Sequence, residues 1–76
     1  MPKLPVISGP ELIRALVRAG YEVVRRRGSH VTLISRVTAQ TIPVPVHGGR
    51  DIPAGTLRAI PREAGLTVED LVRLLD

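Results

Sequence analysis

The residues with the clearest chemical potential form one short run, in which three arginines lead into a Gly-Ser turn and a histidine (residues 25–30). An imidazole titrates near neutral pH and can take up or release a proton there. Arginine binds phosphate oxygens through its paired N–H groups and stabilises negative charge that develops during phosphoryl chemistry. The run therefore predicts binding or cleavage of RNA.

His30 is the candidate catalytic residue of this run. As a general base it would take the proton from a ribose 2′-hydroxyl, so that this oxygen attacks the adjacent phosphorus and leaves a 2′,3′-cyclic phosphate and a 5′-hydroxyl end. The candidate RNA-binding or phosphate-binding residues are polar or cationic: Arg26, Arg27, Ser29, Lys3 and Arg50. This chemistry needs no metal and no cofactor, and DNA, which lacks the 2′-hydroxyl, would not be cut.

An amphipathic helix is predicted before the run. Ser8 stands three residues before Glu11 in a capping-box pattern, and apolar residues then recur at helical spacing until Gly20. These signals predict a helix over residues 9–19.

Two further helices are predicted after the run. Helical spacing returns over residues 53–64, where Asp51 is the expected cap and Pro61 is expected to kink or divide the helix. Thr67, with Asp70 three residues later, predicts the cap of a short last helix.

Three β-rich segments, residues 21–26, 30–35 and 40–47, lie between the helices and are joined by short turns. Such connections predict a three-stranded antiparallel sheet with the helices on one face, which is an α+β fold of order αβββα plus a short terminal helix. Pro43 and Pro45 lack amide hydrogens, so the third strand is expected at an edge of the sheet.

Side-chain alternation predicts that both histidines lie on the open face of this sheet. Val31 and Leu33 would face the helices, which leaves His30 on the other side, and His47 would point outward from the third strand. The pairing of these strands would bring His47 within about two residues of register of His30. His47 would then be a second acid or base, or a structural residue of the following turn.

The composition predicts one domain over residues 1–76 that binds anionic partners. Eleven Lys and Arg against seven Asp and Glu give a formal charge of +4, which favours a polyanion through long-range attraction and counterion release. The lack of cysteine excludes a disulfide framework and a thiolate metal site. No signal peptide or membrane-spanning run is visible, so we expect a soluble cytoplasmic protein without a membrane partner.

Three tripeptides occur in a distinctive order: Gly-Ser-His at residues 28–30, Pro-Val-His at 45–47 and Gly-Thr-Leu at 55–57. With them the chain resembles HicA-type toxins (YcfA-like), which are mRNA interferases of bacterial type II toxin–antitoxin systems. The resemblance implies a fold like that of double-stranded-RNA-binding domains and metal-independent cleavage of single-stranded mRNA, with His30 catalytic. It also implies a HicB-type antitoxin that covers this histidine. Pro61 departs from the family pattern.

Other functions stay open from the residues alone. His30 would be an ordinary polar residue in a non-catalytic RNA-binding module or an inactive toxin relative; the absence of Phe and Trp counts against base stacking but not against binding of double-stranded RNA. Direct DNA binding is not expected, because helix-turn-helix spacing is lacking. A metal held by His30 and His47 would have only Asp51 as a nearby third ligand.

Overall fold

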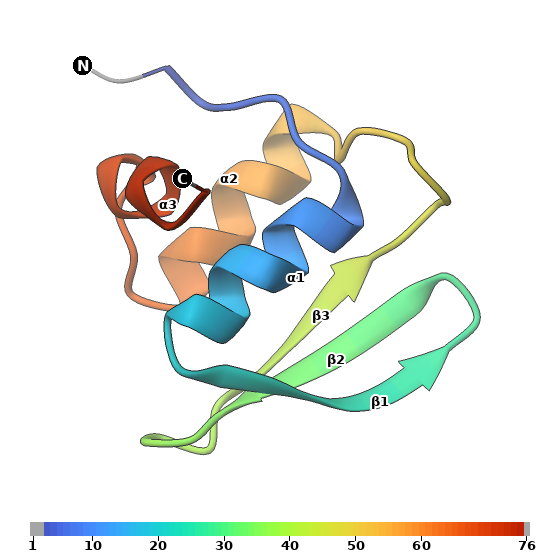
Figure 1. The fold of residues 1–76 in the computed structure, drawn as a ribbon, viewed down its shortest axis with the longest axis vertical. Helices are drawn as coiled ribbons and strands as arrows, with labels where there is room; N and C mark the ends of the chain where they lie inside the picture. Colours follow the sequence, from blue (N-terminus) through green and yellow to red (C-terminus); the bar gives the residue numbers. More distant parts are fainter. Residues whose placement is uncertain (1–2, 76) are drawn as a thin grey trace.

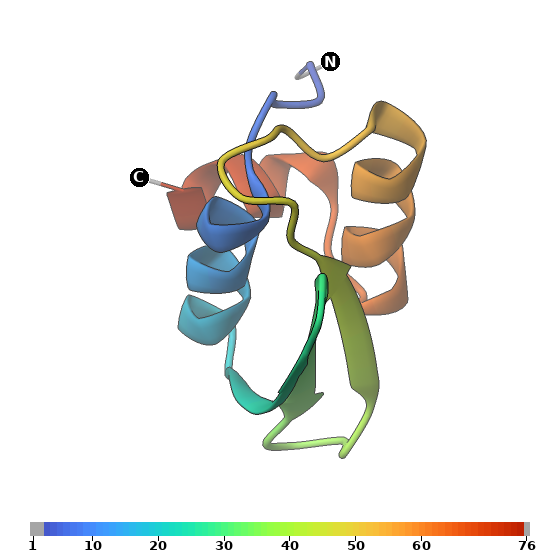
Figure 2. The ribbon, with the colours of Figure 1, turned by 90° about the vertical axis from the view of Figure 1, so that its right-hand side faces the viewer.

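The computed structural model describes residues 3–75, which form helices and strands in the order α–β–β–β–α–α (Figure 1). The elements are α1 (Gly9–Arg18), β1 (Tyr21–Arg27), β2 (His30–Ser35), β3 (Thr41–Pro45), α2 (Ala54–Glu63) and α3 (Val68–Leu75). The strands form one antiparallel sheet in the order β1-β2-β3. The helices lie on one side of this sheet (Figure 2). The predicted α+β architecture is therefore confirmed.

The core lies between the sheet and the helices, because each strand turns its buried apolar residues to the same side. The largest fully buried side chains come from all three helices and from β2 and β3: Leu12, Leu16, Leu33, Ile42, Leu57, Leu71 and Val44. Burying one such side chain contributes about 1.5–3 kcal/mol. α1 and α2 contact the sheet, whereas α3 packs against α1 and α2.

A capping box begins α1, as predicted. The Ser8 hydroxyl accepts the Glu11 amide (3.4 Å), and the Glu11 carboxylate accepts the Ser8 amide (3.2 Å). This reciprocal pair satisfies two N–H groups that have no partner within the helix.

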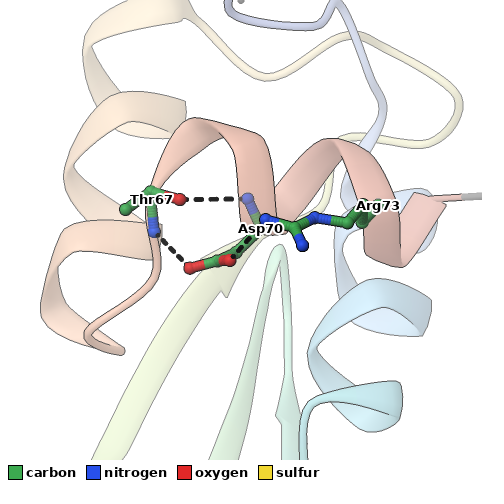
Figure 3. A network of polar contacts seen from close by, with 3 residues as sticks. All are labelled: Thr67, Asp70 and Arg73. Carbon is green, nitrogen blue, oxygen red and sulfur yellow. Dashed lines mark hydrogen bonds and ion pairs between the residues drawn. The ribbon is translucent and has the colours of Figure 1, made fainter.

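A second reciprocal cap begins α3 (Figure 3). The Asp70 amide donates to the Thr67 hydroxyl and the Thr67 amide donates to the Asp70 carboxylate, both at 3.0 Å. The other carboxylate oxygen of Asp70 pairs with Arg73 at 3.3 Å. Hydrogen bonding to Thr67, its backbone first, lowers the pKa of Asp70, with a smaller contribution from Arg73.

One expectation for α2 is wrong. Asp51 does not cap the helix: it forms an isolated antiparallel bridge with Ser8, and Pro53 occupies the N-cap without a side-chain hydrogen bond. This bridge, with the Ile52 amide donating to the Ile7 carbonyl (2.9 Å), commits Asp51 to backbone pairing before the helix starts. α2 itself is present as predicted and continues through Pro61 to its end at Glu63, so of the two effects expected of this proline the division does not occur.

β3 is an edge strand, as its prolines predict. The Val46 amide, one residue after Pro45, donates to the Ser29 carbonyl of the hairpin, so the alternating amide positions of Pro43 and Pro45 face away from β2 and leave no gap inside the sheet. None of the helices within residues 3–75 is long and apolar enough to span a lipid bilayer.

Candidate active site

His30 begins β2 directly after a two-residue turn. Gly28 and Ser29 form this turn, and Arg27 and His30 are cross-strand neighbours on either side of it. Gly28 has φ +56°, a positive value that glycine adopts without strain and that tight hairpin turns require. The turn therefore fixes Arg27 beside His30.

A β-bulge in β1 decides which arginines share the face of His30. Val23 pairs with Leu33, which is buried against the helices. The next pair along the ladder joins Arg25 to Thr32, which leaves Val24 as an extra residue. Strict alternation from Val23 would turn Arg25 towards the helices, and the bulge turns it to the open face instead.

The open face consists of three rows of cross-strand neighbours. From the turn inward these rows are Arg27–His30–Pro45, Arg25–Thr32–Pro43 and Glu22–Ile34–Thr41. Arg26 pairs with the buried Val31 and so belongs to the opposite, helix-facing side of the hairpin. His30 itself is exposed, as the alternation predicted.

Ser29 contacts the imidazole as well as forming the turn. Its Oγ lies 3.4 Å from Nδ1 of His30, with the direction of the hydrogen bond set by the tautomer. Its carbonyl oxygen accepts the Val46 amide at 2.6 Å, which ties the chain after β3 to the hairpin. A contact at Nδ1 leaves Nε2 of His30 available to a substrate.

The positive charge beside His30 is not neutralised by other side chains. Within residues 3–75, Arg25, Arg26 and Arg27 are exposed and make no side-chain hydrogen bond or ion pair. At the other end of the open face, Glu22 pairs with Arg36 at 3.5 Å. The cations of this face without an ion pair in the described chain, Arg25 and Arg27, therefore lie at the end that contains His30.

His47 lies beyond β3, in a turn. The strand ends at Pro45, so the predicted extension of the third strand to residue 47 is wrong. The chain turns here because Gly48 has φ +61° and the Arg50 amide donates to the His47 carbonyl at 3.1 Å. His47 nevertheless follows Pro45, the cross-strand neighbour of His30, by the predicted two residues, and its side chain is exposed.

The first residue of α1 packs against the end of β3. A Cβ atom on Gly9 would lie 2.7 Å from the Pro45 carbonyl oxygen and 2.9 Å from Cγ2 of Val46. Only glycine allows this approach without a shift, so α1 holds the strand end that faces His30.

Lys3 and Arg50 are exposed but lie outside the hairpin. The described N-terminal segment before α1 starts on the far side of the helices from the sheet (Figures 1 and 2). Arg50 ends the turn after β3, next to the bridge between Ser8 and Asp51. Of the candidate residues, the structure thus brings Arg27 and Ser29 to His30.

The sequence interpretation named Arg26 as a phosphate-binding candidate and did not name Arg25. The structure places Arg25, not Arg26, on the face of His30. A signal for Arg25 exists, because a two-residue turn pairs Arg27 with His30 and turns both outward, whereas the apolar pattern turns Val23 inward. In a regular strand, residues 23 and 27 would lie on the same face, because side chains alternate. Since one must face inward and the other outward, one extra residue must lie between them.

In the described chain, His30 does not line the three hollows of the surface that lie among the helices. Hollows of the surface lie among the helices, one between α1 and α3 beside Arg14 and Leu75, and another beside α2. In residues 3–75, no three His, Cys, Asp or Glu side chains lie close enough together to hold a metal ion. Since His30 is exposed at the start of β2, a ligand can reach it across the open face of the sheet.

Comparison with known proteins identifies the family. A family model described as the HicA toxin of bacterial toxin–antitoxin systems matches residues 9–66, which include α1, the whole sheet and α2. A search of curated proteins found no match. The chain therefore belongs to the HicA family, the toxins of bacterial toxin–antitoxin systems, and an antitoxin is its implied partner.

Proposed function

We propose that this toxin is a metal-independent endoribonuclease that blocks translation by cleaving single-stranded mRNA, with His30 as the general base. The observation that carries the proposal is the exposed imidazole of His30 beside the guanidinium of Arg27, which has no ion pair within residues 3–75, on the open face of the sheet. Proton transfer and phosphate binding require these two groups side by side.

The reaction is an intramolecular transfer of the phosphoryl group. Nε2 of His30 takes the proton of a ribose 2′-hydroxyl, and the 2′-oxygen forms a bond to the adjacent phosphorus. The bond from phosphorus to the 5′-oxygen breaks, and this oxygen takes up a proton. The products are a 2′,3′-cyclic phosphate and a 5′-hydroxyl end. The contact of Ser29 with Nδ1 supports this assignment, because it engages one ring nitrogen and leaves Nε2 for the substrate.

Arg27 is the cation best placed to stabilise charge on the reacting phosphate. Cross-strand neighbours on one face have Cβ atoms about 5 Å apart, so one phosphate can meet both the imidazole and the guanidinium. Arginine donates paired hydrogen bonds to phosphate oxygens and stays charged throughout. Arg26, on the other side of the hairpin, is the less favourable of the two arginines first considered.

A HicB-type antitoxin that covers His30 is the proposed partner. The support for this proposal is the open face of the sheet, where the free arginines and His30 are exposed. Covering this face would exclude RNA from the imidazole and keep the toxin inactive.

The test is cleavage of end-labelled single-stranded RNA in excess chelator by the parent protein and by His30→Ala. His47→Ala is measured in parallel, because His47 is the other candidate acid or base near this end of the sheet and its imidazole is also exposed. We expect cyclic-phosphate fragments from the parent and a rate about 10²–10⁴-fold lower with His30→Ala, the usual contribution of a general base.

Cleavage at the parent's rate by His30→Ala would refute the assignment of the base. RNA left intact by the folded parent would refute ribonuclease activity and favour the other candidate, a non-catalytic RNA-binding module. Circular dichroism of each variant establishes that it is folded. No loss of core packing is expected, since both imidazoles are exposed.

A further inference from the structure

We infer that the RNA strand crosses the open face of the sheet along β1, where Arg25 and Arg27 bind neighbouring phosphates and Arg26 binds none. This inference rests on the proposed function, and it extends the binding site to Arg25. It follows from the bulge at Val24, because regular alternation from Val23 through Val24 would exchange the faces of these arginines.

Arg25 and Arg27 form a pair of cations with a defined spacing. They lie two residues apart on the same face, which corresponds to about 6.7 Å along an extended strand. Two flexible guanidinium groups at this separation can hold two consecutive phosphates of one nucleic-acid strand. Arg27 is the direct neighbour of His30, and Arg25 is its diagonal neighbour at about 7–8 Å. The phosphate at Arg27 would then be the reacting one, and its neighbour would be held by Arg25.

The distribution of charge on the open face favours one position for the RNA strand, beside His30. Arg36 lies at the other end of this face, where it forms an ion pair with Glu22 at 3.5 Å. Within the described chain no acid pairs with Arg25 or Arg27. Long-range attraction therefore directs a polyanion to the row that contains His30.

Arg26 provides a matched control within the same hairpin. It has the same charge as Arg25, is exposed as Arg25 is, and is its immediate neighbour in sequence. Its cross-strand partner is the buried Val31, so its side chain leaves the hairpin on the helix-facing side. A purely electrostatic contribution from net charge would make the two arginines equivalent, whereas the bulge makes them different.

The experiment measures binding in the His30→Ala background, where the RNA is not cut. A short fluorescent single-stranded RNA of mixed sequence is titrated with His30→Ala alone and with Arg25→Ala or Arg26→Ala added, at several salt concentrations. The logarithm of the binding constant falls with log [salt], and loss of one phosphate contact lowers the magnitude of this slope by about 0.7 for a single strand. We expect this decrease for Arg25→Ala and an unchanged slope for Arg26→Ala.

Equal slopes for the two arginine variants would overturn the inference, and so would a larger decrease for Arg26→Ala. Cleavage by the parent protein separates this result from the proposed function. If the parent cuts RNA and the two arginines are equivalent, the binding face is wrong and the ribonuclease stands. If the parent does not cut RNA but only Arg25→Ala lowers the slope, the binding face stands and the ribonuclease is wrong.

Discussion

Replacement of Gly9 by alanine tests the packing of α1 against the end of β3. At helical positions without strain, glycine-to-alanine changes stabilise proteins by about 0.4–1 kcal/mol, because alanine restricts the unfolded chain. We expect the opposite sign at Gly9. The added Cβ would lie 2.7 Å from the Pro45 carbonyl oxygen and 2.9 Å from Cγ2 of Val46. A backbone oxygen cannot rotate away, so α1 or the end of β3 must move.

The magnitude follows from these contacts. Forcing extra volume into a packed site costs about 1–3 kcal/mol. After the favourable entropy contribution of alanine is subtracted, we expect a net loss of about 1–2 kcal/mol. For a domain of this size, such a loss lowers Tm by roughly 4–16 °C.

Gly55→Ala is the matched control for this measurement. Gly55 lies in α2, and a Cβ there would meet no atom within 4 Å. We therefore expect stabilisation by up to about 1 kcal/mol. Thermal and urea unfolding, followed by circular dichroism, compare both variants with the parent protein. If Gly9→Ala proves as stable as Gly55→Ala, the close approach of α1 to β3 is refuted.

Two further predictions concern the helix caps. Ser8→Ala should lower the free energy of unfolding by about 1 kcal/mol through loss of the capping box, and an unchanged urea midpoint would contradict this role. For Asp70, the lowered pKa in the folded state means that the unfolded state binds the proton first as the pH falls. The stabilisation is therefore complete at neutral pH and is lost below about pH 4, as the pH falls through the folded-state pKa. Relative to the parent protein, Asp70→Asn should lower Tm at neutral pH and leave it unchanged in strong acid. An equal decrease in Tm in strong acid would show that the charge of the carboxylate is not the source of the stabilisation.

Most of the fold could be predicted from the sequence, because local patterns determine it. The capping boxes, the apolar spacing of the helices and the alternation in β2 all agree with the structure. Where prediction failed, pairing between distant segments decided the outcome. Asp51 pairs with Ser8, 43 positions earlier in the chain, and no local pattern around Asp51 indicates this bridge.

The candidate site was predictable in part. Alternation within β2 was sufficient to place His30 on the open face, and the prolines of β3 were sufficient to identify an edge strand. The faces of the three arginines required the registers of β1 and β2 to be considered together, because the bulge becomes necessary only when both strands and their turn are fixed. The end of β3 depended on the backbone conformation of Gly48, which residue type alone leaves open.

The most direct test of the ribonuclease proposal compares an RNA with its fully 2′-O-methylated copy, each incubated with the parent protein in excess chelator. If the 2′-oxygen is the nucleophile, only the unmodified RNA is cut, and mass spectrometry finds fragments that end in a 2′,3′-cyclic phosphate beside fragments that begin with a 5′-hydroxyl. Cleavage of the methylated copy, or fragments that carry a 5′-phosphate and a 3′-hydroxyl, would contradict the mechanism assigned to His30.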